Sequence, residues 1–228
     1  MTAADDAARR PEVVAFDVNE TLLDLAPVRA TLVELGQPEH VLPAVFSRTL
    51  LTGFAAATAG TWTSFRDAFL AALAQGTDLA PAARTQVADA FTELAPHPDV
   101  EPALRRLTAA GVRAVALTHG SAAVAEAGLE RGGVSPLVER VLSSEVIRTW
   151  KPARAVYLWA AGVCDVPPGA MGLVAAHGWD VHGALRAGLG AAWFPRSERT
   201  YPEVFDRRAL VADDLAGAVD ALLALPPR

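Results

Sequence analysis

Apolar positions divide the chain into a first part with helical spacing and a second part with short buried runs. Residues 13–16 form an apolar run that ends at Asp17, which is typical of a fully buried strand. From residue 24 to residue 96 the apolar positions recur at helical spacing, with breaks near residues 36–38, 60, 76–81 and 96–98. This first part predicts about four helices and no strand.

After Pro98 the pattern alternates between helices and strands. We expect helices at residues 100–110, 121–131 and 152–163, and strands at residues 112–117, 138–142, 171–175 and 191–194. A helix runs from the third of these strands to Ala187, and a last helix is capped by Asp213. The alternation predicts βαβ units and a mainly parallel sheet. We therefore predict an α/β fold, with a discontinuous core of residues 1–24 and 97–228 and a helical cap of residues 25–96.

Four polar residues follow predicted strands although they lie far apart in the sequence. They are Asp17, Thr118, Lys151 and Asp180. Ligands of parallel sheets bind beyond the carboxyl ends of the strands. We therefore expect these side chains to converge at one edge of the sheet.

Composition excludes several classes of function. The net charge of −6 gives no basic surface for nucleic acid, and the single cysteine, Cys164, excludes an intramolecular disulfide framework and a cysteine-rich zinc site. The N-terminus is polar and lacks the apolar segment of a signal peptide, and we expect no run long enough to cross a membrane. The chain is expected to be cytoplasmic, without nucleic-acid or membrane partners.

The chain contains one lysine, Lys151, among its 20 basic residues. A coding bias toward arginine replaces surface lysines at little cost. A remaining lysine indicates a position where a compact ammonium differs from a planar guanidinium, with chance as the competing explanation.

Four ordered segments, AFDVNETLLD, ALTHGS, WKP and LVAAHGWDVHGALRAGL, resemble the motifs of the haloacid dehalogenase superfamily. They are most similar to its type II branch, the L-2-haloacid dehalogenases, and the resemblance extends over essentially the whole chain. It implies a Rossmann-like core with an inserted helical cap, and Asp17 as a nucleophile that forms a covalent ester.

The chain departs from the phosphatase members of this superfamily at two acidic positions. Asn19 stands where those enzymes carry an acid two residues after the nucleophile, and Ala176 stands where they carry a magnesium ligand. Magnesium prefers hard oxygen ligands. We expect no metal and no cofactor, and we interpret Glu20 and Asp24 as a solvated turn and the entry to the cap.

The resemblance assigns roles to the remaining site residues. Lys151 is expected to hold Asp17 and Asp180, and Asp180 to orient or deprotonate the hydrolytic water. For His177, catalysis and a structural role stay equally open. The residues expected to bind substrate are Thr118, His119, Asn19, Tyr157, Trp179 and, as the halide-binding arginine of the cap, Arg48.

The expected function is hydrolytic dehalogenation of short 2-halocarboxylic acids, including haloacetates such as fluoroacetate. Asp17 would displace halide from C2, and water would then release a 2-hydroxy acid. The alternatives are a magnesium-dependent phosphatase of the same fold, a hydrolase of another activated C–X bond, and a non-catalytic binding module. A homodimer, the stereochemical preference and the physiological substrate stay open.

Overall fold

A six-stranded sheet forms the centre of the protein, and each strand is parallel to its neighbours. The computed structural model describes residues 8–228, so residues 1–7 of the predicted core lie outside the described residues. The strands lie in the order β5-β4-β1-β6-β7-β8. Their bounds are Val13–Asp17 for β1, Arg113–Thr118 for β4, Arg140–Ser143 for β5, Met171–Ala175 for β6, Gly190–Trp193 for β7 and Leu210–Val211 for β8. The predicted α/β fold with a mainly parallel sheet is confirmed.

Strand β1 lies in the middle of the sheet and is buried along its whole length. It pairs with β4 on one side and with β6 on the other, with Asp17 opposite Leu117. Helices cover both faces, which explains why this strand is an uninterrupted apolar run in the sequence.

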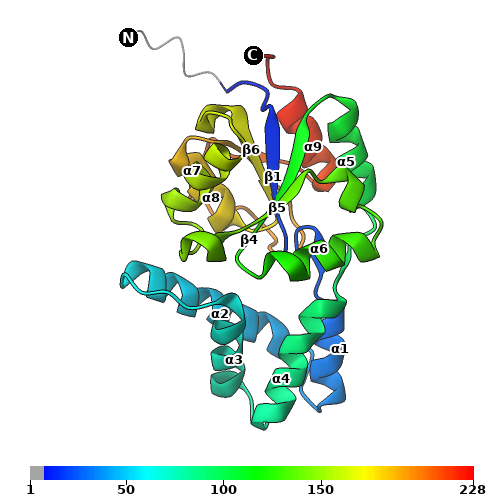
Figure 1. Cartoon of the computed structure of the whole chain (residues 1–228), viewed down its shortest axis with the longest axis vertical. Coiled ribbons are helices and arrows are strands. Elements are labelled where there is room, and N and C mark those ends of the chain that lie inside the picture. The colour runs from blue at the N-terminus through cyan, green and yellow to red at the C-terminus, as the bar shows by residue number, and fades with distance from the viewer. Residues whose placement is uncertain (1–7) are drawn as a thin grey trace.

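Alternate residues of β1 contribute to two separate apolar layers. Val14 and Phe16 pack on the face covered by α5 (Val100–Ala109) and α9 (Leu215–Leu223). Val13 and Ala15 pack on the face covered by α7 (Arg154–Val163) and α8 (Gly178–Ala187). Figure 1 shows these two pairs of helices on either side of the strands.

Four helices follow β1 and gather at the end of the molecule away from the two termini (Figure 1). They are α1 (Ala26–Glu34), α2 (Val41–Thr58), α3 (Phe65–Gly76) and α4 (Pro81–Asp89), with a 3-10 turn at Ala90–Glu93. Their apolar side chains belong to the same buried cluster as one face of the sheet. The division into a core and a cap domain therefore stays a prediction.

The structure differs from the expected elements at three places. Two short strands, β2 (Leu23–Asp24) and β3 (Ala95–Pro96), pair antiparallel at the base of the helical layer, where no strand was expected. They are too short to produce a periodic pattern. Asp214 caps the last helix in place of Asp213, because its side chain accepts the Gly217 N–H. Helix α7 begins at Arg154, two residues after Pro152.

Helix α2 is long and apolar enough to cross a membrane by length and composition, with a mean hydropathy of 1.3. The expectation that no run reaches this length is therefore wrong on this measure. In the fold, its buried face carries Leu42, Val45, Phe46, Thr49 and Gly53. Core helices of soluble proteins pass the same test.

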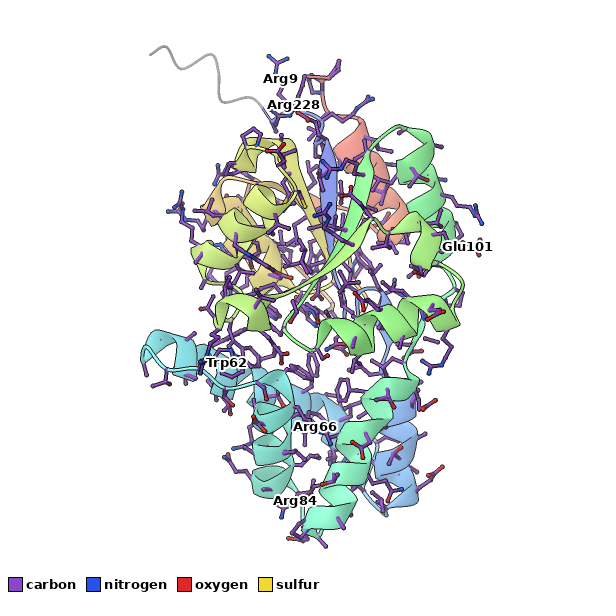
Figure 2. The ribbon with its side chains drawn as sticks, in the orientation of Figure 1. Arg9, Trp62, Arg66, Arg84, Glu101 and Arg228 are labelled. Atoms are coloured by element: carbon purple, nitrogen blue, oxygen red, sulfur yellow. The ribbon has the colours of Figure 1, made fainter. Side chains whose placement is uncertain are left out.

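Trp150 joins the helical layer to the sheet. Its Nε1 donates a hydrogen bond of 2.9 Å to the carbonyl of Thr63. Its ring lies so close to Gly53 that a Cβ built on this glycine would be 2.3 Å from the ring. Trp62, labelled in Figure 2, lies at the same boundary with the Arg148 guanidinium 5.0 Å from its ring centroid, so Trp62 packs there and does not line the pocket around Asp17.

Gly53→Ala should weaken this contact, because the added methyl group overlaps the Trp150 ring. Overpacking of this kind costs about 1–3 kcal/mol, which corresponds to a Tm lower by roughly 2–12 °C for a chain of this size. Gly162→Ala is the matched control, because no heavy atom lies within 4 Å of its added Cβ. Calorimetry should find the control unchanged or stabilised; an unchanged Tm for Gly53→Ala would contradict the packing described.

Candidate active site

The polar residues predicted to follow strands meet at the carboxyl edge of the sheet. Asp17 ends β1 and Thr118 ends the neighbouring strand β4. Asp180 lies in the first turn of α8, the helix that follows β6. The carboxyl ends of neighbouring parallel strands open at one edge, so residues distant in sequence share one site.

Lys151 is completely buried and binds three acceptors at this edge. Its Nζ lies 2.7 Å from Asp17 Oδ1, 2.6 Å from Asp180 Oδ2 and 3.1 Å from the carbonyl oxygen of Leu117. An ammonium has three N–H donors, so each acceptor can receive one. This arrangement uses the compact geometry that distinguishes lysine from arginine.

Asp180 lies behind Lys151 and is also completely buried. Its second carboxylate oxygen accepts a hydrogen bond of 2.7 Å from the Tyr157 hydroxyl. Tyr157 is therefore a support for Asp180, and the expectation that it lines the substrate pocket is wrong. The side chain lies on the buried face of α7, which the helix uses for packing.

The second oxygen of Asp17 is bound by two further donors. The Thr21 hydroxyl donates to Oδ2 at 2.8 Å and accepts the backbone N–H of Ala176 at 3.0 Å. The Nδ1 atom of His177 lies 3.0 Å from the same oxygen. The nucleophile predicted from sequence is thus fixed in orientation through both of its oxygens.

His177 lies between two carboxylates, and its side chain is 6% exposed. While Nδ1 faces Asp17, Nε2 lies 3.0 Å from Glu20 Oε2. Glu20 lies in a turn as expected, but its carboxylate is bound to His177 and is not free in solvent. Glu20 has a φ of 62°, a left-handed conformation that non-glycine residues seldom adopt, and this conformation is part of the turn from which its carboxylate reaches His177.

The charges of this cluster shift the pKa of each member. Burial opposes ionisation of Asp17, but Lys151 and His177 outweigh burial and hold the pKa of Asp17 well below its usual range. Burial also opposes the charge of His177, yet Asp17 and Glu20 raise its pKa to about 10. For Lys151 the two carboxylates outweigh burial and raise the pKa, while burial raises the pKa of Asp180.

The pKa of a second buried histidine, His119, is shifted in the opposite direction. Burial, followed by the charge of Lys151, lowers its pKa well below the usual value. The ring lies between Trp150 and Trp179, with centroid distances of 4.5 and 5.6 Å. Its Nε2 is buried and has no hydrogen-bond partner among the described residues.

A small pocket lies above the Asp17 carboxylate, with a cavity volume of about 10 Å³, which is room for about one water molecule. Its lining combines polar groups with apolar walls from the helical layer: Asp17, Asn19, Phe46, Leu50, Phe65, Thr118, His119, His177 and Trp179. A larger, mostly apolar pocket of about 100 Å³ shares Asn19, Phe65 and Thr118 with it. The Thr118 hydroxyl accepts the N–H of Gly120 at 3.0 Å, so its own proton can point to a ligand.

A family model described as haloacid dehalogenase-like hydrolase matches residues 11–188. The chain belongs to this family. The (S)-2-haloacid dehalogenase H-109 of Pseudomonas putida is 29% identical over 138 residues, which is 60% of this chain and 62% of that enzyme. The match therefore spans less than two thirds of that curated relative.

Solved structures of L-2-haloacid dehalogenases share the fold of this family member. The enzyme RSc1362 superposes with a TM-score of 0.85 at 25% identity, covering 94% of this chain and 99% of that chain. The Xanthobacter autotrophicus enzyme, solved with chloropropionic acid covalently bound, gives a TM-score of 0.83 at 20% identity and the same coverage. The similarity to the L-2-haloacid dehalogenase branch is thus seen in both sequence and fold.

Arg48 does not reach the pocket of this haloacid dehalogenase-like hydrolase. Its side chain is exposed and donates a hydrogen bond of 3.1 Å to Gln75 Oε1. At about 100° per residue, Arg48 lies roughly a third of a turn from the centre of the buried face of α2, which includes Phe46 and Thr49. The expectation that Arg48 binds halide is therefore wrong for this structure. The lining of the small pocket contains no arginine, whereas Arg66 lines the larger adjoining pocket.

The donor set beside Asp17 does not fit a magnesium ion of the kind that phosphatase members hold. Asn19 and Ala176 replace acidic side chains, and His177 with its raised pKa is a cation between Asp17 and Glu20. Among residues 8–228, no group of three or more His, Cys, Asp and Glu side chains is arranged to hold a metal ion.

Sequence reasoning brought Asp17, Asn19, Thr118, His119, His177 and Trp179 correctly to one pocket, with Lys151 and Asp180 beneath it. It did not find Thr21 or the contact of Glu20. Both residues could have been proposed from the sequence as neighbours of the Asp17 carboxylate, because they follow Asp17 within one tight turn. Their direction depends on the left-handed backbone at Glu20, which an acidic residue does not indicate.

Lys151→Met should leave Asp180 buried with a carboxylate that has lost its cation. We expect the free energy of unfolding at pH 7 to fall by about 3–5 kcal/mol. The loss should shrink toward pH 5, because the unpaired carboxylate has a raised pKa and takes up a proton. Urea titrations at both pH values test this, and Lys151→Met combined with Asp180→Asn should recover part of the loss. A loss independent of pH would contradict the prediction.

Proposed function

We propose that the protein hydrolyses short 2-halocarboxylic acids through an ester on Asp17. The observation that carries this proposal is the ionised Asp17 carboxylate at the floor of a small pocket with apolar walls, fixed by two cationic side chains. Displacement of halide from carbon needs an ionised, oriented nucleophile and no proton for the leaving group. The names of the relatives support the same reaction.

In the first step an oxygen of Asp17 forms a bond to C2 of the substrate while the carbon–halogen bond breaks. Halide leaves with the electron pair of that bond, and configuration at C2 inverts. Lys151, whose Nζ lies 2.7 Å from Asp17 Oδ1, keeps the nucleophile ionised, since two unit charges even about 4 Å apart interact by roughly 4 kcal/mol at an effective dielectric constant near 20. The apolar walls at Phe46, Phe65 and Trp179 exclude competing water.

In the second step water attacks the carbonyl carbon of the Asp17 ester. The bond between that carbon and the substrate oxygen breaks, the 2-hydroxy acid departs and the carboxylate of Asp17 is restored. Over both steps one water is consumed, and one halide and one proton are released.

The substrate carboxylate is assigned to the polar groups at the pocket rim. Asn19 and the Thr118 hydroxyl face the pocket, and helix α6 (Ala122–Arg131) begins just beyond them. Unsatisfied N–H groups at a helix N-terminus favour an anion. With Arg48 directed away, Asn19, Thr118 and the two histidines supply the polar contacts.

Halide release from chloroacetate, 2-chloropropionate and fluoroacetate tests the reaction. We expect release from at least one of them that persists in EDTA, because Asn19 and Ala176 replace acidic metal ligands. p-Nitrophenyl phosphate with added magnesium is the contrasting substrate. Phosphatase activity that EDTA abolishes, without any halide release, would overturn the proposal in favour of the phosphatase alternative.

Single turnover in ¹⁸O-water should place the label in Asp17 and leave the first product unlabelled. The reason is that water attacks the carbon of the Asp17 ester, so its oxygen stays with the enzyme. Mass spectrometry of the peptide containing Asp17 and of the hydroxy acid measures both. Label in the product of the first turnover would instead indicate direct attack of water on C2.

A further inference from the structure

The larger of the two pockets is a mostly apolar chamber of about 100 Å³ between the helical layer and α6, beside the pocket above Asp17. Three rings of the helical layer line one side of this chamber: Phe65, Phe69 and Phe91, with centroids 5.0–6.2 Å apart. Val124 and Ala125 of α6 line the opposite side. The two reaction steps described above leave this space unused.

We propose that the chamber binds the alkyl chain of the substrate, and that the preferred substrates are 2-halocarboxylic acids with a linear apolar chain of about four carbons on C2. This inference rests on the proposed function and names its substrate class. An apolar cavity of about 150 Å³ accepts benzene, so a chamber of about 100 Å³ has room for roughly four carbons.

The chamber is continuous with the reacting centre. Three residues line both the chamber and the Asp17 pocket and form a neck between them: Asn19, Phe65 and Thr118. The Asp17 pocket itself has room for about one water molecule. A chain on C2 therefore needs further space, and the neck leads to it.

The direction of the reaction agrees with this placement. Displacement with inversion puts the halogen opposite the attacking oxygen of Asp17, so a chain on C2 has to leave sideways. Asn19 and Thr118, to which the substrate carboxylate is assigned, lie at the neck. They therefore hold C2 where its chain can enter the chamber.

The charged side chains at the chamber are already bound to other groups. Arg66 of α3, labelled in Figure 2, is half-exposed and lies 2.6 Å from Asp89 Oδ1. The backbone of Phe65 binds the Glu145 carboxylate. A chain that ends in a carboxylate or an ammonium would lose hydration here without gaining a free partner, so an uncharged chain fits better.

A series of racemic 2-chloro acids measures the length of chain that the chamber accepts. Each methylene group moved from water to an apolar lining favours binding by about fourfold. 2-Chlorohexanoate has three more methylene groups than 2-chloropropionate, so kcat/KM for chloride release should be higher by roughly 60-fold. 2-Chlorodecanoate exceeds the chamber and should gain nothing more. A series that stays level or falls from 2-chloropropionate onward would overturn the proposal.

Ala125→Leu tests the position of the chain, because it adds three carbons to the chamber wall. We expect the ratio of kcat/KM for 2-chlorohexanoate to that for 2-chloropropionate to fall at least about 10-fold. Ala127→Leu is the matched control, because Ala127 is exposed on the same helix and both residue types favour helices. This control should keep the parent ratio. An equal loss for both substrates in Ala125→Leu would make the chamber a route of access and overturn the proposal.

Val124→Ala changes the chamber in the opposite direction. Val124 is half-buried and lines the chamber, and the substitution removes two carbons from the wall. We expect the acid with the highest kcat/KM to become longer by about one or two carbons. This variant keeps the test valid if Ala125→Leu fails to fold, which its thermal transition shows. An unmoved optimum would contradict the assignment of the chain to this chamber.

Binding of acids without a halogen separates this inference from the reaction itself. By isothermal titration calorimetry, hexanoate should bind the parent chain at least about 10-fold more tightly than propionate, and Ala125→Leu should remove the difference. If this difference is found but no 2-chloro acid releases chloride, the proposed function is overturned. If chloride is released without any preference for chain length, the chamber proposal alone is overturned.

Discussion

The buried Lys151 ammonium is the interaction on which the rest of the site depends. Removing an ammonium from water costs several kcal/mol, so the fold must supply acceptors for each of its protons. Asp17 at the end of β1, the Leu117 carbonyl in β4 and Asp180 in α8 supply them. Because these acceptors come from separate βα units, the register of the sheet and the geometry of the site determine one another.

The sheet and the convergence of the site could be predicted because both depend on short-range patterns. A strand buried on both faces is an uninterrupted apolar run, and residues that follow such runs lie at the carboxyl edge. The same pattern predicts that Asp17, Thr118 and Asp180 lie together at this edge. The single lysine in an arginine-rich chain marked Lys151, and the structure places it at full burial between two carboxylates.

The errors concern the direction of side chains, which sequence spacing determines less well. Arg48 lies two residues after Phe46 on α2, and a helix turns by about 100° per residue. The Arg48 side chain therefore points to solvent, while the Phe46 side chain lines the pocket. Tyr157 lies on the buried face of α7 and reaches Asp180 from behind. Glu20 turns inward because its backbone is left-handed, a conformation that an acidic residue does not predict.

The cluster combines the carboxylates of Asp17, Asp180 and Glu20 with the protonated side chains of Lys151 and His177. The stabilising effect of these charges is therefore limited to a range of pH. Asp17 has a pKa below its unfolded value, so its stabilising effect is complete above the unfolded pKa and is lost as pH falls toward the folded pKa. His177 has a pKa raised to about 10, so its effect is complete below the unfolded pKa and is lost as pH rises through about 10. Both contributions are available between these limits. A metal ion could supply similar charge but would have to be acquired, whereas Lys151 and His177 are fixed by the chain itself.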